Sequence, residues 1–212
     1  NMKSILIYGD SNVWGDGDIS GRRIPMQCQW PNILRKNLGY EYLIYQEGLP
    51  GRLAGNEEER MPYKNGINTF LATYRSLAPI DILIIALGSN DLIKFYKKTS
   101  EKIIKDLLKY TEIINEQFSD FKYKEKYFNS TLPRIIYILP SNFDYVFRGS
   151  DKFSELSEKN RLEIIEYFHK HKDEYEFIIY NDAKLFEDGV HFNLNDHQNI
   201  AKLVKKKILG ID

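Results

Sequence analysis

Short apolar runs alternate along the chain with longer stretches in which apolar residues recur at every third or fourth position. Each run leads into glycine, proline or a small polar residue, which is typical of a buried β-strand followed by a turn. The first run breaks off at Gly9, Asp10 and Ser11, and the most apolar run breaks off at Gly88. The pattern predicts strands at residues 5–8, 41–46, 80–87, 134–139 and 177–180.

The intervening stretches predict amphipathic helices, whose ends are marked by proline, glycine or a capping side chain. These markers are Pro31, Gly39, Pro79, Gly210, and Thr99 or Ser100. The helices are predicted at residues 29–38, 67–77, 99–118, 153–169 and 194–209. In the helix at 153–169, the residues expected to face the core are Leu156, Leu162, Ile165 and Phe168. Residues 16–23 and 56–64 are expected to be loops, and residues 122–129 receive no assignment.

Strand and helix therefore alternate along the whole chain, without a linker, a repeat or a change in composition. Such alternation predicts a three-layer α/β/α sandwich with a five-stranded, mainly parallel sheet. The almost continuous apolar character of residues 80–87 suits a central strand that is covered on both faces. With 212 residues, the chain is expected to form a single domain, residues 1–212, with a substantial core.

The charge balance argues against two classes of partner. Basic and acidic residues both number 30, so the chain has no basic field that would hold nucleic acid or an anionic membrane. No segment approaches the roughly 18 apolar residues that span a bilayer, and the first apolar run is too short for a signal peptide. The lysine-rich segments 94–98 and 202–207 are expected to be solvated helix faces.

Cysteine and histidine usage points to a protein without a disulfide or a metal. The single cysteine, Cys28, excludes an internal disulfide and cannot form a thiolate metal site alone. It is compatible with a reducing compartment, and a cytoplasmic location is expected. His169, His171 and His197 have no partner at ligand spacing, so we expect them to be solvated and expect no metal site.

Residues with chemical potential follow several predicted strands. Ser11 follows the first strand, the turn at 48–51 follows the second, Asn90 follows the third, and Asp188 and His191 precede the last helix. Because parallel strands end at one edge of a sheet, these residues are expected to converge there. Taken alone, Ser11 also fits a helix N-cap, Asn90 a turn, and His191 a helix entry.

Together these residues supply the parts of an activated serine. Ser11 needs a base, and the short spacing of Asp188 and His191 around a glycine lets the carboxylate reach one imidazole nitrogen while the other faces the serine. Ester hydrolysis also needs hydrogen-bond donors for the developing oxyanion. The backbone amides of Ser11 and Gly51 and the side chain of Asn90 are the candidate donors.

Four short blocks, in the same order, resemble the SGNH-hydrolase family of GDSL-type esterases. The serine, asparagine and histidine blocks match Gly9-Asp10-Ser11, Gly88-Ser89-Asn90-Asp91 and Asp188-Gly189-Val190-His191. The glycine block is less well defined, and Gly51 fits its pattern, with Gly48 as the alternative. The resemblance implies a flavodoxin-like sandwich, a triad of Ser11, His191 and Asp188, an oxyanion hole of Ser11, Gly51 and Asn90, and no cofactor.

The stretch Glu47-Gly48-Leu49-Pro50-Gly51-Arg52 is similar to a branch of arylesterases that also act as acyltransferases. Asn12 stands where the family usually has leucine, which is expected to change the choice of substrate rather than the mechanism. Asn12, Trp14 and Phe192 are therefore candidates for substrate binding, although core packing explains the two aromatic residues equally well. Asp10 is expected to fix the turn through hydrogen bonds.

The sequence therefore predicts a cofactor-free serine esterase that hydrolyses or transfers short acyl groups of small-molecule esters. Deacetylation of a carbohydrate is the main alternative, because it uses the same chemistry. A non-catalytic ligand-binding module is a further alternative, but the chain lacks the glycine spacing of phosphate-binding loops. An α/β-hydrolase elbow is excluded, since Val13 occupies the place of its second glycine. The oligomeric state stays open, a homo-oligomer included.

Overall fold

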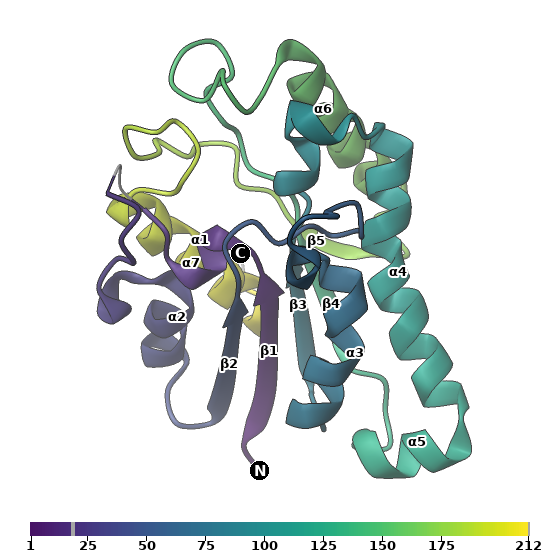
Figure 1. Cartoon of the computed structure of the whole chain (residues 1–212). Coiled ribbons are helices and arrows are strands. Elements are labelled where there is room, and N and C mark those ends of the chain that lie inside the picture. The colour runs from purple at the N-terminus through teal and green to yellow at the C-terminus, as the bar shows by residue number, and fades with distance from the viewer. Residues whose placement is uncertain (18–19, 212) are drawn as a thin grey trace.

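The computed structural model describes residues 1–17 and 20–211, and its framework is one five-stranded sheet. The strands are β1 (Lys3–Gly9), β2 (Tyr42–Gly48), β3 (Ile82–Ala86), β4 (Arg134–Ile138) and β5 (Glu176–Ile178). They lie in the order β2-β1-β3-β4-β5, and every neighbouring pair is parallel (Figure 1). Gly9 pairs with Gly48 on one side and with Ala86 on the other, so β1, β2 and β3 end at the same level.

The helices connect the strands and cover both faces of the sheet. They are α1 (Ser11–Trp14), α2 (Trp30–Leu38), α3 (Gly66–Leu77), α4 (Ser100–Ser119), α5 (Phe121–Tyr127), α6 (Glu155–Lys170) and α7 (Leu194–Leu209). Short 3-10 turns are η1 (Met26–Cys28), η2 (Pro62–Lys64), η3 (Asn90–Leu92) and η4 (Lys94–Tyr96). Within the described residues, no helix combines the length and the apolar character that a membrane crossing requires.

Two apolar cores lie on opposite faces of the sheet, because successive strand side chains point to opposite sides. On one face, Leu6 and Tyr8 of β1 pack in a cluster with side chains of α3, α4 and α6. On the other face, Ile5 and Ile7 pack in a cluster with side chains of α2 and α7. Figure 1 shows the same division, with α2 and α7 on one side of the sheet and α3 and α4 on the other. The predicted three-layer sandwich is confirmed.

Most predicted elements are present with small shifts of their ends. The predicted strands and the helices at 67–77, 99–118 and 194–209 correspond to observed elements, and Thr99 caps α4 by accepting a hydrogen bond from the amide of Lys102. The unassigned segment 122–129 contributes most of α5. Asp10 fixes the first turn as expected, since its carboxylate accepts a hydrogen bond from the amide of Asn12.

The predicted inner face of α6 is wrong for two of its four residues. Ile165 and Phe168 are buried, but Leu156 and Leu162 are 61% and 50% exposed. Arg161 is buried instead, because its guanidinium pairs with Glu158 and donates to the side chain of Asn181. An arginine can be buried here because its guanidinium is paired, while Leu156 and Leu162 face solvent.

Candidate active site

Ser11 lies where the central strand β1 ends and the short helix α1 begins. The chain turns sharply here, and a Cβ atom at Gly9 would lie only 2.4 Å from the side chain of Val13. Ser11 is the first residue of α1, and Asp10 caps the helix. The serine is therefore held at the carboxyl edge of the sheet, where the strand ends of a parallel sheet form a crevice.

His191 joins Ser11 and Asp188 into one hydrogen-bonded chain. The Nε2 atom of His191 lies 3.0 Å from the Oγ atom of Ser11, and its Nδ1 atom lies 2.5 Å from Oδ2 of Asp188. The other oxygen of Asp188 accepts hydrogen bonds from the backbone amides of Val190 and His191. Gly189 adopts a positive φ of 69°, which permits the tight turn between carboxylate and imidazole. The structure thus brings the three predicted residues together.

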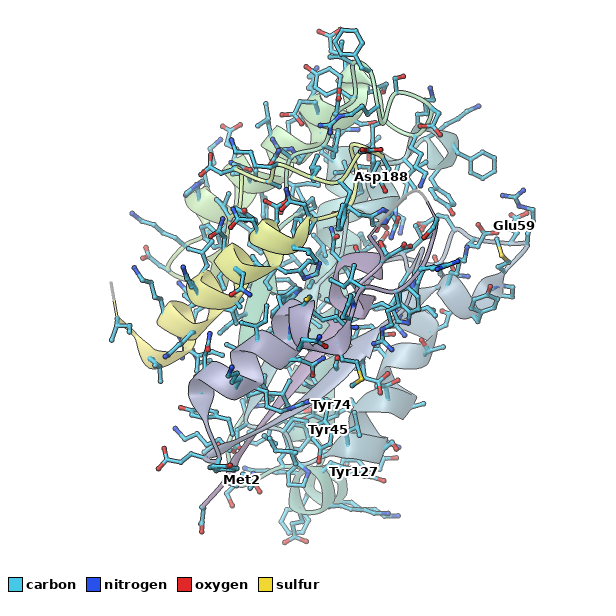
Figure 2. All side chains as sticks on the ribbon, turned by 90° about the vertical axis from the view of Figure 1, so that its left-hand side faces the viewer. Met2, Tyr45, Glu59, Tyr74, Tyr127 and Asp188 are labelled. Atoms are coloured by element: carbon cyan, nitrogen blue, oxygen red, sulfur yellow. The ribbon has the colours of Figure 1, made fainter. Side chains whose placement is uncertain are left out.

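Figure 2 shows where Asp188 lies on the molecule. Asp188 is near the end of the molecule opposite to Met2, which precedes the first strand. The site therefore lies beyond the carboxyl ends of the strands, as the topology requires for an open parallel sheet.

The electrostatics of Asp188 favour a permanent carboxylate. Partial burial acts to raise its pKa, but the hydrogen bonds from the side chain and amide of His191 and from the amide of Val190 outweigh burial. They lower the pKa of Asp188 to about 2. A charged carboxylate beside Nδ1 fixes the tautomer whose Nε2 atom can accept a proton from Ser11.

Asp10 behaves in the opposite way. Its burial raises its pKa to about 6, although the hydrogen bond from the amide of Asn12 and the nearby imidazole of His191 lower it. Two carboxyl groups at one site therefore differ widely in their ease of ionisation. Asp188 contacts the imidazole directly, whereas Asp10 supports the turn that carries the serine.

Two of the three candidate oxyanion donors, Ser11 and Asn90, lie at one pocket. In the part of the chain that the structure describes, no acceptor is found for the backbone N–H groups of Ser11 and Gly51. The side-chain amide of Asn90 donates one hydrogen to the carbonyl of Arg52, 3.1 Å away, and keeps its second hydrogen for another partner. Ser11, Asn90 and His191 line one small pocket, and Gly51 is not among the described residues that line it.

Gly48 has a structural role. A Cβ atom at this position would lie 2.3 Å from the backbone nitrogen of Trp14, so only glycine lets β2 pack this closely against α1. Its position inside the sheet is also fixed by its pairing with Gly9. Close packing therefore accounts for Gly48 without any role in chemistry.

The three candidate substrate-binding residues occupy different places. Asn12 lines the pocket beside Ser11, and its side-chain oxygen accepts a hydrogen bond from the amide of Phe192. Phe192 is only 4% exposed and packs against Tyr180 and His197 in the core. Trp14 lies beneath the guanidinium of Arg23 and lines none of the pockets found near Ser11 in the described residues.

Comparison with known proteins adds the family to this geometry. The family model described as GDSL-like lipase/acylhydrolase matches residues 5–204. The chain belongs to this family. A comparison with curated protein sequences finds no match.

Solved structures with the same GDSL-type fold cover almost the whole chain. A carbohydrate acetylesterase family member from Sinorhizobium meliloti has 21% identity and a TM-score of 0.83 over 99% of this chain and 100% of that one. The aryl esterase of M. smegmatis has 18% identity and a TM-score of 0.83 over the same shares. A lipase/acylhydrolase from Enterococcus faecalis has 18% identity and a TM-score of 0.66 over 99% and 96%. At sequence identities of 18–21%, this similarity shows that the fold is shared and no more than that.

This GDSL-like protein contains a buried lysine, Lys98, which pairs with Asp91, the residue after Asn90. The prediction that Lys98 is solvated is wrong. The side chain of Lys98 is only 2% exposed, although the segment 94–98 was expected to be solvated. Its ammonium lies 2.6 Å from Asp91, 2.7 Å from Asp106 and 2.9 Å from Glu57. Burial lowers the pKa of Lys98, but these carboxylates outweigh burial and hold the pKa above its usual value. Lysine is buried here because it is surrounded by opposite charge.

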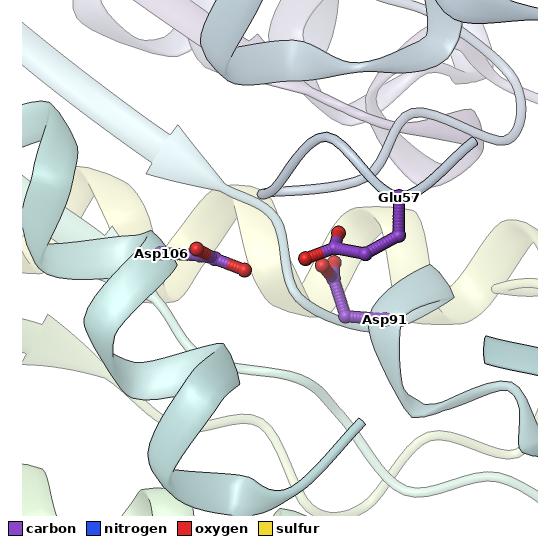
Figure 3. A group of neighbouring side chains, drawn as sticks. All are labelled: Glu57, Asp91 and Asp106. Carbon is purple, nitrogen blue, oxygen red and sulfur yellow. The ribbon is translucent and has the colours of Figure 1, made fainter. Parts of the chain in front are cut away.

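The three carboxylates converge closely enough to hold a cation. Figure 3 shows Glu57, Asp91 and Asp106 pointing toward one space, and one oxygen of each lies within 4.8 Å of the others. The ammonium of Lys98 contacts all three, and Lys102 pairs with Glu57 and Asp106, so the protein's own cations already occupy this space. Asp91 also accepts a hydrogen bond from the amide of Ala54, which connects the cluster to the segment after Gly51.

The prediction for His197 is also wrong. His197 is fully buried rather than solvated, and its Nδ1 atom accepts a hydrogen bond from the amide of Trp30. Burial lowers the pKa of His197 to about 4, against the opposing charge of Asp196. The residue therefore joins α7 to the start of α2 as a neutral imidazole. Its contact to a residue far away in the chain explains why a local pattern could not reveal it.

Proposed function

We propose that this protein is a serine esterase in which Ser11 is the nucleophile, His191 the general base and acid, and Asp188 the residue that orients His191. The observation that carries the proposal is the position of His191, whose two ring nitrogens contact Ser11 and Asp188 respectively. A serine hydroxyl becomes a good nucleophile only when a base can take its proton, and the base needs a partner that fixes its tautomer.

The proposed reaction has two halves. Oγ of Ser11 attacks the ester carbonyl while Nε2 of His191 takes the hydroxyl proton. The tetrahedral intermediate then collapses, the C–O bond to the alcohol breaks, and His191 gives the proton to the departing alcohol oxygen. Water attacks the resulting acyl-serine by the same route in reverse, with His191 again taking and returning a proton. A second alcohol in place of water would give acyl transfer.

The oxyanion that forms in each half needs donors already in place. We propose the backbone amides of Ser11 and Gly51 and the side-chain amide of Asn90 for this task. Ser11 and Gly51 carry N–H groups for which the described residues provide no acceptor, and Asn90 keeps one free hydrogen. Since close packing explains Gly48, Gly51 is the better candidate of the two glycines.

The substrate is proposed to be a small ester with a short acyl group. The space enclosed beside Ser11 is only about 20 Å³, which favours an acetyl-sized acyl chain over a long one. Polar side chains, including Ser89, Ser141 and Asn142, form part of its lining. This polarity favours a carbohydrate or polyol ester as the second candidate substrate beside an aryl ester. Apart from the ester and the water or alcohol that accepts the acyl group, the proposed steps use only groups of the chain.

The test compares wild-type protein with Ser11→Ala and with Ser119→Ala, an exposed serine at the end of α4, as the matched control. Ser11→Ala is expected to lower kcat for p-nitrophenyl acetate by about a million-fold, because a triad acts as a unit. A fluorophosphonate probe is expected to label the wild type and Ser119→Ala but not Ser11→Ala. Equal turnover or equal labelling in Ser11→Ala would refute the esterase proposal, and a wild type with neither turnover nor labelling would favour a binding module.

A further inference from the structure

A second carboxylate, Asp16, lies close to the reactive nitrogen of His191. Its Oδ2 atom is 3.9 Å from Nε2, the nitrogen that also faces Ser11. Asp188 contacts the other ring nitrogen. The imidazole therefore lies between two carboxylates, and only Asp16 is on the side where a proton is exchanged with the reactants.

The chain holds Asp16 in a fixed position relative to the serine. Its backbone N–H donates to the carbonyl of Ser11 at 2.9 Å, directly after the short helix α1. On its other side, Asp16 pairs with Arg23 in an isolated antiparallel bridge. The carboxylate is thus anchored through the same turn that positions the nucleophile.

Within residues 1–17 and 20–211, no lysine or arginine forms an ion pair with this carboxylate. Among the described residues, His191 is the single ion-pair partner of Asp16, at the long distance of 3.9 Å. The guanidinium of Arg23 is occupied elsewhere, since it donates to the carbonyl of Trp14 and lies 5.0 Å from the centre of that ring. The side chain of Asp16 is 20% exposed, so a ligand can reach it.

The reaction geometry decides which part of the substrate Asp16 faces. The departing alcohol oxygen receives its proton from Nε2 of His191, so it must come within hydrogen-bond reach of that atom, about 3 Å. The alcohol oxygen then lies no more than about 7 Å from Oδ2 of Asp16, a distance that one or two carbon atoms and a polar group can bridge. The acyl carbon, in contrast, is bound to Ser11.

We infer that Asp16 selects esters whose alcohol part carries an electropositive group, a hydroxyl donor or an ammonium, next to the ester oxygen. This inference rests on the proposed esterase function and names the alcohol class for the same site. A carboxylate accepts a hydrogen bond from a neighbouring hydroxyl strongly, because bonds to charged groups are stronger than bonds between neutral groups. It repels an alcohol part that carries phosphate or carboxylate. Partial esters of sugars and polyols are the natural substrates with this chemistry.

The experiment compares kcat/KM within two pairs of acetate esters that differ in one group. 2-Hydroxyethyl acetate and propyl acetate differ by a hydroxyl in place of a methyl group. Acetylcholine and 3,3-dimethylbutyl acetate have the same shape, but only the first is charged. Wild-type protein is expected to prefer the electropositive member of each pair about tenfold, the effect of one hydrogen bond or ion contact to a partly exposed carboxylate.

Two variants separate charge from hydrogen bonding. Asp16→Asn keeps an acceptor oxygen, so it is expected to lose the preference for acetylcholine and to keep most of the preference for 2-hydroxyethyl acetate. Asp16→Ala is expected to lose both. Asp173→Asn, an exposed residue beyond the end of α6, is the matched control and is expected to keep both preferences.

Other outcomes overturn the inference. If Asp16 acted only through His191, both variants would lower kcat/KM for all four esters by one common factor and leave the two ratios unchanged. An absence of any preference in the wild type would also contradict it. Failure of the esterase proposal itself is distinguishable, because Ser11→Ala would then hydrolyse the four esters as fast as the wild type does.

Discussion

The Nε2 atom of His191 lies 3.0 Å from the Oγ atom of Ser11, although 180 positions separate the two residues in the chain. A second bond of equal sequence separation runs beside it, from the amide of Phe192 to the side-chain oxygen of Asn12. These two neighbouring links join the turn after β1 to the segment before α7. We therefore expect the position of His191 relative to Ser11 to depend on the hydrogen bond of Asn12 as well as on the sheet.

Replacing Asn12 by leucine, the residue usual in the family, is expected to weaken this join. Asn12→Leu removes the acceptor of the Phe192 amide and leaves a partly buried N–H group unpaired, which costs about 1 kcal/mol or more of the free energy of unfolding. Asn12→Asp keeps an acceptor oxygen and is the matched comparison. Urea denaturation measures both, and a Leu variant as stable as the Asp variant would contradict the assignment.

Replacing Asp188 by asparagine tests the orienting role without changing the shape of the side chain. Asp188→Asn is expected to lower kcat by about ten-thousandfold, because an amide lets the imidazole adopt the wrong tautomer and no longer stabilises its charged form. Asp182→Asn, an exposed neighbour, serves as the control. A loss in Asp188→Asn of less than tenfold in kcat with p-nitrophenyl acetate would exclude the orienting role.

The buried charge of Lys98 is expected to be important for stability. Lys98→Met leaves the buried Asp91 without an ion-pair partner, whereas Asp106 and Glu57 keep Lys102, and breaking a buried ion pair by removing one partner typically costs about 3–5 kcal/mol. The same change at the exposed neighbour, Lys97→Met, is expected to cost much less. Chemical denaturation at one pH compares the two, and equal losses would show that the cluster does not depend on Lys98.

The Lys98 cluster also bears on the site. Asp91 accepts a hydrogen bond from Ala54, and Asn90 donates to the carbonyl of Arg52, so the cluster holds Asn90 and the segment after Gly51 together. If Lys98→Met remains folded, kcat is expected to fall more than KM changes, because the donors are needed mainly when the oxyanion forms.

The parts of the molecule that the sequence predicted are those that depend on local signals. The apolar run of β1 and its abrupt end at Gly9 mark a strand and a turn without knowledge of the rest of the chain. Topology then brings Ser11 close to Asp188 and His191, because all strands of a parallel sheet end on one side.

The parts that were predicted wrongly depend on tertiary partners, which a local pattern does not show. Lys98 is buried because three carboxylates surround it: Asp91 and Asp106 are 7 and 8 positions away in the chain, and Glu57 is 41 positions away. His197 is buried because it accepts a hydrogen bond from Trp30, 167 positions away. A polar residue looks solvated in sequence unless its partner can be seen, and a single sequence does not show that partner.

The buried imidazole of His197 is also expected to make the free energy of unfolding depend on pH. The pKa of this buried imidazole is about 4, whereas an unfolded histidine titrates near its ordinary value of 6.5. Between these values the unfolded chain binds a proton that the folded chain does not, so the free energy of unfolding falls as the pH is lowered from 6.5 toward 4. At pH 5, this single group is expected to lower it by about 2 kcal/mol relative to pH 7.5.

The measurement compares wild-type protein with His197→Gln, which can still accept the hydrogen bond from Trp30 but does not titrate. Asp10 acts in the opposite sense, because its raised pKa of about 6 adds stability at low pH that is lost as the pH rises through 6. Both proteins contain Asp10, so the difference between their pH profiles isolates His197. His169→Gln, at an exposed position, is the control. Identical pH profiles for His197→Gln and the wild type would show that this imidazole is not held neutral in the fold.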